Sequence, residues 1–265
     1  MSRAMFIMTD GMRPDAFQQV STPNLDRLMT NGAYTMSAQS VLPSVTIACH
    51  TSLFYSATPE QHGVSSVGDR SRIRWNGLIE QIKLAGKQSV IFYNWDPLRE
   101  ISRPLSISAS FMANIADVYV DGAFIGDHFI VEHACREIPK NVYDFAFVYF
   151  ATMDECGHKF GWMSDEYLRQ IEIVDGYIGD VLAVTPDDNT ILVQSDHGGH
   201  GHGHGLDIPE DMNVPWIISG PNIKRNYAIQ STITLLDTAP TLARIMDIDP
   251  VSDWAGQCID EVFVK

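Results

Sequence analysis

The sequence predicts an α/β domain with a mainly parallel central sheet that is covered by helices on both faces. Short apolar runs typical of buried strands alternate with segments of helical spacing along most of the chain. The chain has 265 residues, of which 45% are hydrophobic, so it can bury a large core as one unit. We therefore expect a single domain over residues 1–265. The pattern is least regular at about 96–140, where we expect a small lid or insertion, with ordinary surface connections as the alternative.

The expected strands are continuous apolar runs rather than alternating ones, which is typical of a parallel sheet buried on both sides. The run Phe145–Phe150 is the clearest example, since all six of its residues are apolar. The expected strands are residues 4–8, 89–93, 145–150, 189–194 and 214–219.

The expected helices begin with capping signals or carry apolar residues at a spacing of three and four. Thr22 followed by Pro23 is a helix-start signal. In the longest segment Leu168, Ile171 and Val174 fall on one face. The expected helices are residues 22–29, 77–85, 165–182 and 232–246.

The charge of the chain excludes some partners. Lys and Arg number 18 against 33 Asp and Glu, which gives a formal charge of -15 and argues against a nucleic-acid polymer. A small phosphorylated substrate stays compatible with this charge, because bound cations can reverse the local field. No apolar run has the length of a membrane span, so we expect no membrane partner. The oligomeric state is left open.

The cysteines and the start of the chain predict a cytoplasmic protein. The first ten residues are too short for a signal-peptide core. The cysteines are scattered and lack the spacing of a zinc knuckle or a CxxC motif, so we expect free thiols in a reducing compartment. They are Cys49, Cys135, Cys156 and Cys258.

A histidine- and glycine-rich run at residues 195–205 is the strongest sign of function, since it holds four of the nine histidines. Asp196 and His197 follow directly after the expected strand 189–194. Carboxylate and imidazole donors at a strand end suit a borderline divalent metal such as zinc, with manganese or iron as alternatives. A flexible histidine-rich loop is the competing interpretation.

Three other places repeat this pattern. Asp10 stands at the tip of the first strand, and Asp154 and His158 follow the strand 145–150. Thr46 lies near the start of a probable helix, with Ser44 as a competing hydroxyl. In a parallel sheet, sites gather beyond the carboxyl ends of the strands, so these side chains are expected to meet.

The motifs, in this order, resemble the alkaline phosphatase superfamily, and most closely its nucleotide pyrophosphatase/phosphodiesterase-like branch. The resemblance covers nearly the whole chain. It rests on the opening Asp-Gly at 10–11, TPNLDRL at 22–28, PEQHG at 59–63, DxxxH at 154–158, SDHG at 195–198 and LDTAPTL at 236–242.

The resemblance implies an alkaline phosphatase-like fold and two divalent metal ions, zinc first and manganese as the alternative. It implies that one ion is bound by Asp10, Thr46, Asp196 and His197, and the other by Asp154, His158 and His204. His202 is the fallback for His204. His200 is expected to support these ligands, and His62 to be structural.

The activity that follows is two-metal-dependent hydrolysis of phosphoric esters, whether phosphodiesters, nucleotide pyrophosphates or phosphomonoesters. Thr46 is the expected nucleophile and would form a phosphothreonine intermediate. Two metals can clamp the attacking and leaving oxygens, and a threonine hydroxyl needs such activation to attack. A helix N-terminus at Thr46 would also favour an anion. The alternatives are a phosphonate hydrolase or a phosphotransferase on the same core, or a catalytically silent metal-binding protein.

Three residues are candidate substrate contacts. The resemblance puts a donor to the substrate at position 49, where this chain has the weak donor Cys49. Tyr93 and Trp95 could stack on a base, or they could fill the core. We expect Phe54 to belong to the core.

Overall fold

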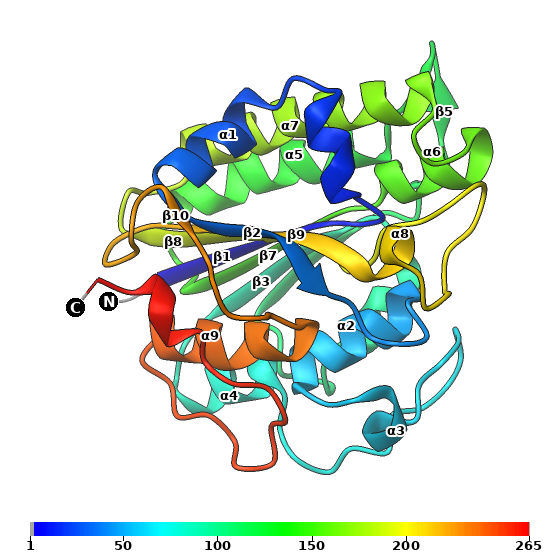
Figure 1. Ribbon diagram of the computed structural model, residues 1–265. Helices are drawn as coiled ribbons and strands as arrows, with labels where there is room; N and C mark the ends of the chain where they lie inside the picture. Colours follow the sequence, from blue (N-terminus) through cyan, green and yellow to red (C-terminus); the bar gives the residue numbers. More distant parts are fainter. Residues whose placement is uncertain (1–2, 265) are drawn as a thin grey trace.

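A mixed sheet of eight strands runs through the middle of the computed structural model, between two layers of helices (Figure 1). The structure describes residues 3–264, so the first two residues and the last residue of the expected 1–265 domain lie outside it. The strand order is β10-β2-β9-β8-β1-β7-β3-β4, and β5 and β6 form a separate hairpin. The strands are β1 (Arg3–Thr9), β2 (Gly32–Gln39), β3 (Ser89–Tyr93), β4 (Ala109–Met112), β5 (Tyr119–Val120), β6 (Ala123–Phe124), β7 (Phe145–Phe150), β8 (Asn189–Gln194), β9 (Asn213–Ser219) and β10 (Tyr227–Ala228).

The helices lie on both faces of the sheet, with α1, α5 and α7 on one side and α2, α4 and α9 on the other (Figure 1). Within residues 3–264, none of the helices is long and apolar enough to cross a membrane. The helices are α1 (Pro23–Thr30), α2 (Thr46–Tyr55), α3 (Pro59–His62), α4 (Leu78–Leu84), α5 (Gly126–Glu137), α6 (Thr152–Phe160), α7 (Asp165–Val184), α8 (Pro209–Met212) and α9 (Thr238–Ile245).

The alternation of side chains along β1 shows why its sequence is apolar throughout. Phe6 and Met8 belong to the core under α2, α4 and α9, whereas Met5 and Ile7 belong to the core under α1, α5 and α7. Successive side chains of a strand point to opposite faces, so a strand covered on both faces needs apolar residues at every position. This confirms the predicted α/β class.

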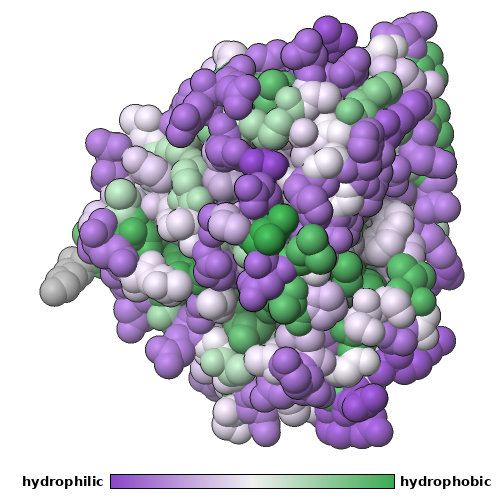
Figure 2. Space-filling model, turned by 45° about the vertical axis from the view of Figure 1, so that its right-hand side comes forward, coloured by the Kyte–Doolittle hydropathy of each residue, from purple (hydrophilic) through white to green (hydrophobic). Residues whose placement is uncertain are grey.

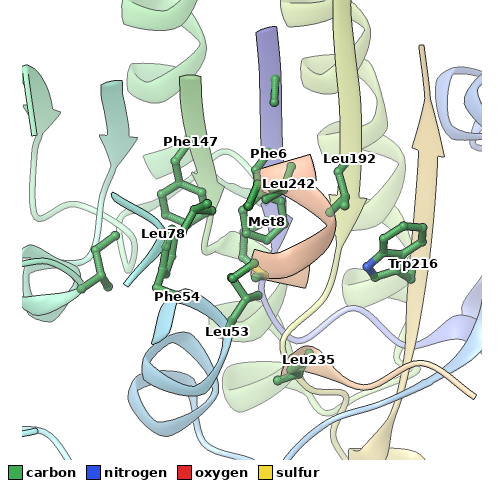
Figure 3. Packing of buried hydrophobic residues seen from close by; sticks show 14 of the residues in the cluster. Phe6, Met8, Leu53, Phe54, Leu78, Phe147, Leu192, Trp216, Leu235 and Leu242 are labelled. Carbon is green, nitrogen blue, oxygen red and sulfur yellow. The ribbon is translucent and has the colours of Figure 1, made fainter. Parts of the chain in front are cut away.

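The core fixes the position of α2. Phe54 packs edge-on against Phe147 with ring centroids 5.1 Å apart, and it also contacts Phe6 at 6.2 Å (Figure 3). Leu53 is buried in the same cluster. The prediction that Phe54 is a core residue is confirmed. Because these contacts anchor the helix on β1 and β7, its first residue, Thr46, is held at a defined place.

The central strands run parallel. β1 pairs in parallel with both β7 and β8, while β9 pairs antiparallel with β8 and with β2. The carboxyl ends of β1, β7 and β8 therefore meet at one edge of the sheet. Asp10, Asp154 and Asp196 all lie just beyond these three strand ends.

The predicted strands at 4–8, 89–93, 145–150, 189–194 and 214–219 are confirmed, with ends that differ by at most one residue. The strand β2 was not predicted, because glycine, serine, threonine and glutamine interrupt its apolar pattern. The predicted helix 232–246 was wrong at its start, since α9 begins at Thr238 after a turn over Leu235–Asp237. Asp237 accepts hydrogen bonds from the amide and hydroxyl of Thr234, and Pro240 is tolerated because it lies in the first turn of α9.

Most of the segment 96–140 belongs to the body of the domain. β4 pairs in parallel with β3 at the edge of the sheet. Ile130 and Ala134 of α5 are buried in one core cluster with Val90 and Val148. The β5–β6 hairpin lies between β4 and α5 along the chain. That this hairpin forms a lid over the site stays a prediction.

Candidate active site

Two groups of side chains that could hold a metal ion meet at the edge of the sheet where β1, β7 and β8 end. Within each group the candidate ligand atoms lie within 4.8 Å of one another. The rings of His197 and His204 stack with centroids 3.8 Å apart and so join the groups. One group is Asp10, Asp196 and His197, and the other is Asp154, His158 and His204.

The three histidines present the same ring nitrogen to the site. The Nδ1 atom of His197 lies 2.8 Å from the carbonyl oxygen of Gly198, and that of His204 lies 2.8 Å from the carbonyl oxygen of Ser44. The Nδ1 atom of His158 lies 3.0 Å from the carbonyl oxygen of His202. A nitrogen that faces a carbonyl oxygen carries a proton, so Nε2 is the nitrogen that each of the three imidazoles, in its neutral form, can offer to a metal.

The Nε2 atoms face carboxylates across the site. His197 Nε2 lies 3.3 Å from Asp10 Oδ1, and His158 Nε2 lies 3.4 Å from Asp154 Oδ2. His204 Nε2 lies 3.7 Å from the other oxygen of Asp154. Donor atoms from separate elements thus converge on two points.

Three buried carboxylate oxygens of the site lack a hydrogen-bond partner among the described residues. They are Oδ1 of Asp10, Oδ1 of Asp154 and Oδ2 of Asp196. Burying a charged oxygen without a partner is costly, and a cation is the partner that carboxylates and imidazoles together accept. The donor set therefore fits divalent metal ions, zinc or manganese among them.

Burial and neighbouring charges shift the pKa values of the candidate ligands away from their usual range. Burial, together with the charges of Asp196 and Asp154, raises the pKa of Asp10 well above its usual value. Burial also raises the pKa of Asp196 to about 7. Burial and the neighbouring His197 lower the pKa of His204 to about 4. A bound cation would therefore favour the ionised carboxylates and offset the cost of burying their charge.

Asp154 and His158 behave differently because they form an ion pair. The hydrogen bond with Asp154 raises the pKa of His158 to about 9. Burial opposes ionisation of Asp154, but the hydrogen bond with His158 and the nearby imidazoles of His197 and His158 lower its pKa.

Thr46 is the first residue of α2, and its hydroxyl faces the site. Thr46 Oγ1 lies 3.1 Å from His197 Nε2. The amide of Cys49 donates to the carbonyl of Val45 at 3.0 Å as the first turn of the helix closes. The backbone amides of residues 46–48 point out of the N-terminus of α2, where they can donate hydrogen bonds to an anion. The competing hydroxyl of Ser44 turns instead toward the carbonyl of Leu206, at 3.5 Å.

Two neighbours of the ligands were not predicted from the sequence. The hydroxyl of Tyr149 donates to Asp10 Oδ2. The Nδ1 atom of His50 lies 2.8 Å from the carbonyl oxygen of Thr46 and 3.6 Å from Asp196 Oδ2. Burial lowers the pKa of His50 to about 4, so its ring is neutral. His50 stands four residues after Thr46, and this helical spacing was a signal that could have identified it.

The remaining histidines lie outside the two groups. The ring of His202 is exposed, and its Nδ1 lies 3.1 Å from the carbonyl oxygen of His158. The Nδ1 atom of His200 lies 2.8 Å from Asp211 Oδ1, which places it beside the site rather than in it. His62 is fully buried, with its two ring nitrogens on the Ser52 hydroxyl and on the Val64 amide, as a structural residue would be.

A cavity of about 370 Å³ opens beside the two groups, and Thr46 lines it. Trp95 lines the cavity and also packs against the core cluster on the α2 side of the sheet. Ser65, Ser66 and Val67 from the loop after α3 line the cavity as well. That loop carries no motif, and the sequence did not single it out. The edge of the molecule at the right of Figure 1 comes forward in Figure 2, where hydrophilic residues cover much of the face and apolar residues gather between them.

Cys49 and Tyr93 differ from the predicted role in substrate binding, because neither lines this cavity. Cys49 is fully buried, and its Sγ lies 3.3 Å from the hydroxyl of Ser40. Tyr93 is 4% exposed and belongs to the core cluster on the α2 side of the sheet. Both side chains fill the core beneath the site.

Comparison with known families and structures agrees with this geometry. A family described as "Type I phosphodiesterase / nucleotide pyrophosphatase" matches residues 4–74 and 112–202, which make up more than half of the chain. Six of the seven candidate ligands lie within the matched segments, and His204 lies just beyond the second.

Among curated relatives, a 2,3-bisphosphoglycerate-independent phosphoglycerate mutase of Gracilaria tenuistipitata var. liui is 26% identical over 148 residues, or 51% of this chain and 28% of that protein. The human ectonucleotide pyrophosphatase/phosphodiesterase family member 1 is 22% identical over 195 residues, or 66% of this chain and 21% of that protein. The chain thus spans less than a third of the length of these relatives.

Among solved structures, the murine ectonucleotide pyrophosphatase/phosphodiesterase 5, an inactive variant in complex with AMP, superposes with a TM-score of 0.83. The sequences are 14% identical, and the match covers 100% of each chain. At this identity the likeness establishes the shared fold.

Proposed function

Since the chain belongs to the type I phosphodiesterase/nucleotide pyrophosphatase family, within the alkaline phosphatase superfamily, we propose that it hydrolyses phosphoric esters with two divalent metal ions and Thr46 as the nucleophile. The observation that carries the proposal is the position of Thr46 Oγ1. It lies 3.1 Å from His197 Nε2, at the N-terminus of a buried helix and on the wall of the cavity that holds the second donor group.

The donors divide between two metal ions, for which we propose zinc first and manganese second. Asp10, Thr46, Asp196 and His197 would hold one ion, and Asp154, His158 and His204 the other. Bound there, the ions would lower the pKa of the threonine hydroxyl and stabilise charge on the phosphoryl and leaving oxygens. Gly198, His202 and Ser44 keep the histidines oriented through their carbonyl oxygens.

Catalysis would proceed in two displacements. Thr46 Oγ1 releases its proton to solvent and forms a bond to phosphorus as the bond to the leaving oxygen breaks, which gives a phosphothreonine. The leaving oxygen departs as an anion and takes a proton from solvent. Water then attacks this phosphorus, the bond to Oγ1 breaks, and Thr46 regains its proton. The free amides at the start of α2 can donate to phosphoryl oxygens in both steps.

The cavity wall supports a phosphodiester rather than a monoester. No lysine or arginine is among the described residues that line it. A monoester carries a second negative charge, whereas a diester carries one. Glu155 also lines the cavity, and its carboxylate would oppose the extra charge. A small phosphodiester with an aromatic or nucleoside group near Trp95 suits this wall best.

The experiment is a substrate panel with the protein reconstituted in zinc or manganese. It compares bis-p-nitrophenyl phosphate, p-nitrophenyl phosphate, the p-nitrophenyl ester of thymidine 5'-phosphate and a p-nitrophenyl phosphonate. We expect the diesters to be cleaved with the highest kcat/KM, and Thr46→Ala to lose turnover while Ser44→Ala keeps it. Absence of turnover on all four substrates, with two metals bound per chain, would contradict the proposal and favour a silent metal-binding protein.

A further inference from the structure

A second hollow, of about 250 Å³, lies beside the candidate active site and is lined by Arg70, Arg74 and Arg103. Ile47, the residue after Thr46, lines both this hollow and the active-site cavity. The loop after α3 separates the two spaces. Its residues 65–67 line the active-site cavity, and its neighbours at 64 and 69–71 line the hollow. A molecule bound at Thr46 can therefore extend into the hollow along one wall.

The hollow is basic in a chain whose formal charge is -15. Its two carboxylates are already engaged. Asp69 Oδ2 accepts from the amides of Ser65 and Ser66 at 2.8 and 2.9 Å, and Glu100 pairs with Arg70 at 2.6 Å. Arg74 and Arg103 take part in none of the ion pairs found among residues 3–264. Arg74 and Arg103 therefore lack a carboxylate partner, and the hollow has a formal net charge of +1, because Asp69 keeps its charge while it accepts from neutral amides.

Arg103 is held in place by oxygens that carry no net charge. Its guanidinium donates to the carbonyls of Arg74 and Trp75 at 2.8 and 2.7 Å, and to Asn76 Oδ1 at 3.0 Å. Its backbone amide donates to Glu80 Oε1 at 2.6 Å. The guanidinium itself bonds only to neutral oxygens, whereas the Glu80 carboxylate lies against its backbone amide. A donor fixed in this way loses less entropy when it binds an anion.

We propose that this hollow binds a phosphate-class oxyanion that belongs to the substrate itself, a second phosphate on the molecule whose ester is cleaved at Thr46. This inference rests on the proposed function. Thr51, which lines the hollow, stands five residues after Thr46 on α2, or about 7.5 Å along the helix axis, a distance that a sugar between two phosphates can cover. The active-site cavity lacks a lysine or arginine to neutralise a second phosphate, and guanidinium groups match phosphate oxygens in geometry and charge.

The test uses two esters that differ in one group. They are the p-nitrophenyl ester of thymidine 5'-phosphate and the same ester with an added 3'-phosphate. The measured quantity is the ratio of their kcat/KM values on zinc-loaded protein. We expect the 3'-phosphate to raise kcat/KM by roughly fivefold to tenfold, the effect of a few charge-assisted bonds at an exposed site. The ratio should fall in high salt, because salt screens exposed charges.

Arg74→Gln is the informative variant, because its side chain takes part in none of the hydrogen bonds and ion pairs found among residues 3–264. We expect it to lower the ratio to about twofold and to leave the melting temperature unchanged. Arg169→Gln removes the same charge from an exposed position on α7, away from the hollow, and should keep the ratio of the wild type. An equal ratio in wild type and Arg74→Gln, or a ratio of one in wild type, would overturn the inference.

Two further outcomes separate the alternatives. If inorganic phosphate changes the cleavage of the ester without the 3'-phosphate in wild type but not in Arg74→Gln, the hollow serves a free anion, and its assignment to the substrate is wrong. If neither ester is cleaved, the proposed function fails. Calorimetry with thymidine 3',5'-bisphosphate and thymidine 5'-phosphate then decides on the hollow, which requires tighter binding of the bisphosphate in wild type than in Arg74→Gln.

Discussion

Asp196→Asn should stabilise the metal-free protein at alkaline pH, although it removes a residue of the candidate metal centre. Burial raises the pKa of Asp196 from 3.8 to about 7, so the folded chain binds this proton more tightly than the unfolded chain does. The stability that the protonated group contributes is fully present below about pH 4 and is lost as pH rises toward 7. A rise of about three pKa units corresponds to roughly 4 kcal/mol.

The asparagine variant escapes this loss because it carries no charge. Its Oδ1 can keep the bonds that Asp196 Oδ1 accepts from the amides of Gly11 and His197, at 3.4 and 3.0 Å. Metal-free Asp196→Asn should therefore melt above wild type at pH 8, by roughly 8 °C for a chain of this length, and the difference should shrink toward pH 4. The order should reverse in zinc, because only the wild type gains the full binding energy of the metal.

The assay is thermal unfolding of chelator-treated protein at several pH values, repeated with zinc. Asp207→Asn is the matched control, since it removes one charge from an exposed site in the loop after His204 and should change stability by no more than about 0.5 kcal/mol. A metal-free Asp196→Asn protein that melts below wild type at pH 8 would refute the view that burial of the ionised Asp196 carboxylate destabilises the metal-free fold.

Three further outcomes are expected. His204→Ala should reduce bound zinc from two ions per chain to one, whereas His202→Ala should keep two; elemental analysis decides, and the opposite pattern would make His202 the ligand. Cys49→Ala should keep kcat and KM within about threefold because the thiol points into the core, whereas Trp95→Ala should raise KM. Steady-state kinetics on a diester measures both variants, and the reverse pattern would restore Cys49 as a substrate contact. Phe54→Ala should cost about 3–5 kcal/mol in the free energy of unfolding, because it leaves a cavity between α2 and the sheet; denaturant unfolding with a loss below about 1 kcal/mol would show that α2 is anchored elsewhere.

The strands that carry the site were predictable from the sequence because burial on both faces leaves a continuous apolar run. The strands that end near Asp10, Asp154 and Asp196 were placed within one residue, and parallel pairing then brought the three carboxylates to one edge. The strand β2, second from one edge of the sheet, was missed because it is only partly buried and has a mixed composition.

The supporting parts of the site were harder to predict, since they depend on which atom of a side chain faces inward. The family resemblance favoured His204 over His202, but only the structure shows that His204 Nδ1 meets the carbonyl of Ser44 and leaves Nε2 for the site. Tyr149 lies within an apolar strand, and its bond to Asp10 has no sequence signature. The resemblance placed a substrate donor at position 49, with packing as the alternative, and the buried Cys49 side chain fits packing, because a motif position does not fix the direction of a different side chain.

The central claim is that Thr46 becomes covalently phosphorylated during turnover. Rapid acid quench of zinc-loaded wild type with a substrate labelled at phosphorus, followed by peptide mapping, tests it directly. Label should form on Thr46 within one turnover, and it should be absent from Thr46→Ala and from Ser44. Label on Ser44, or full turnover by Thr46→Ala with no label on the protein, would contradict it.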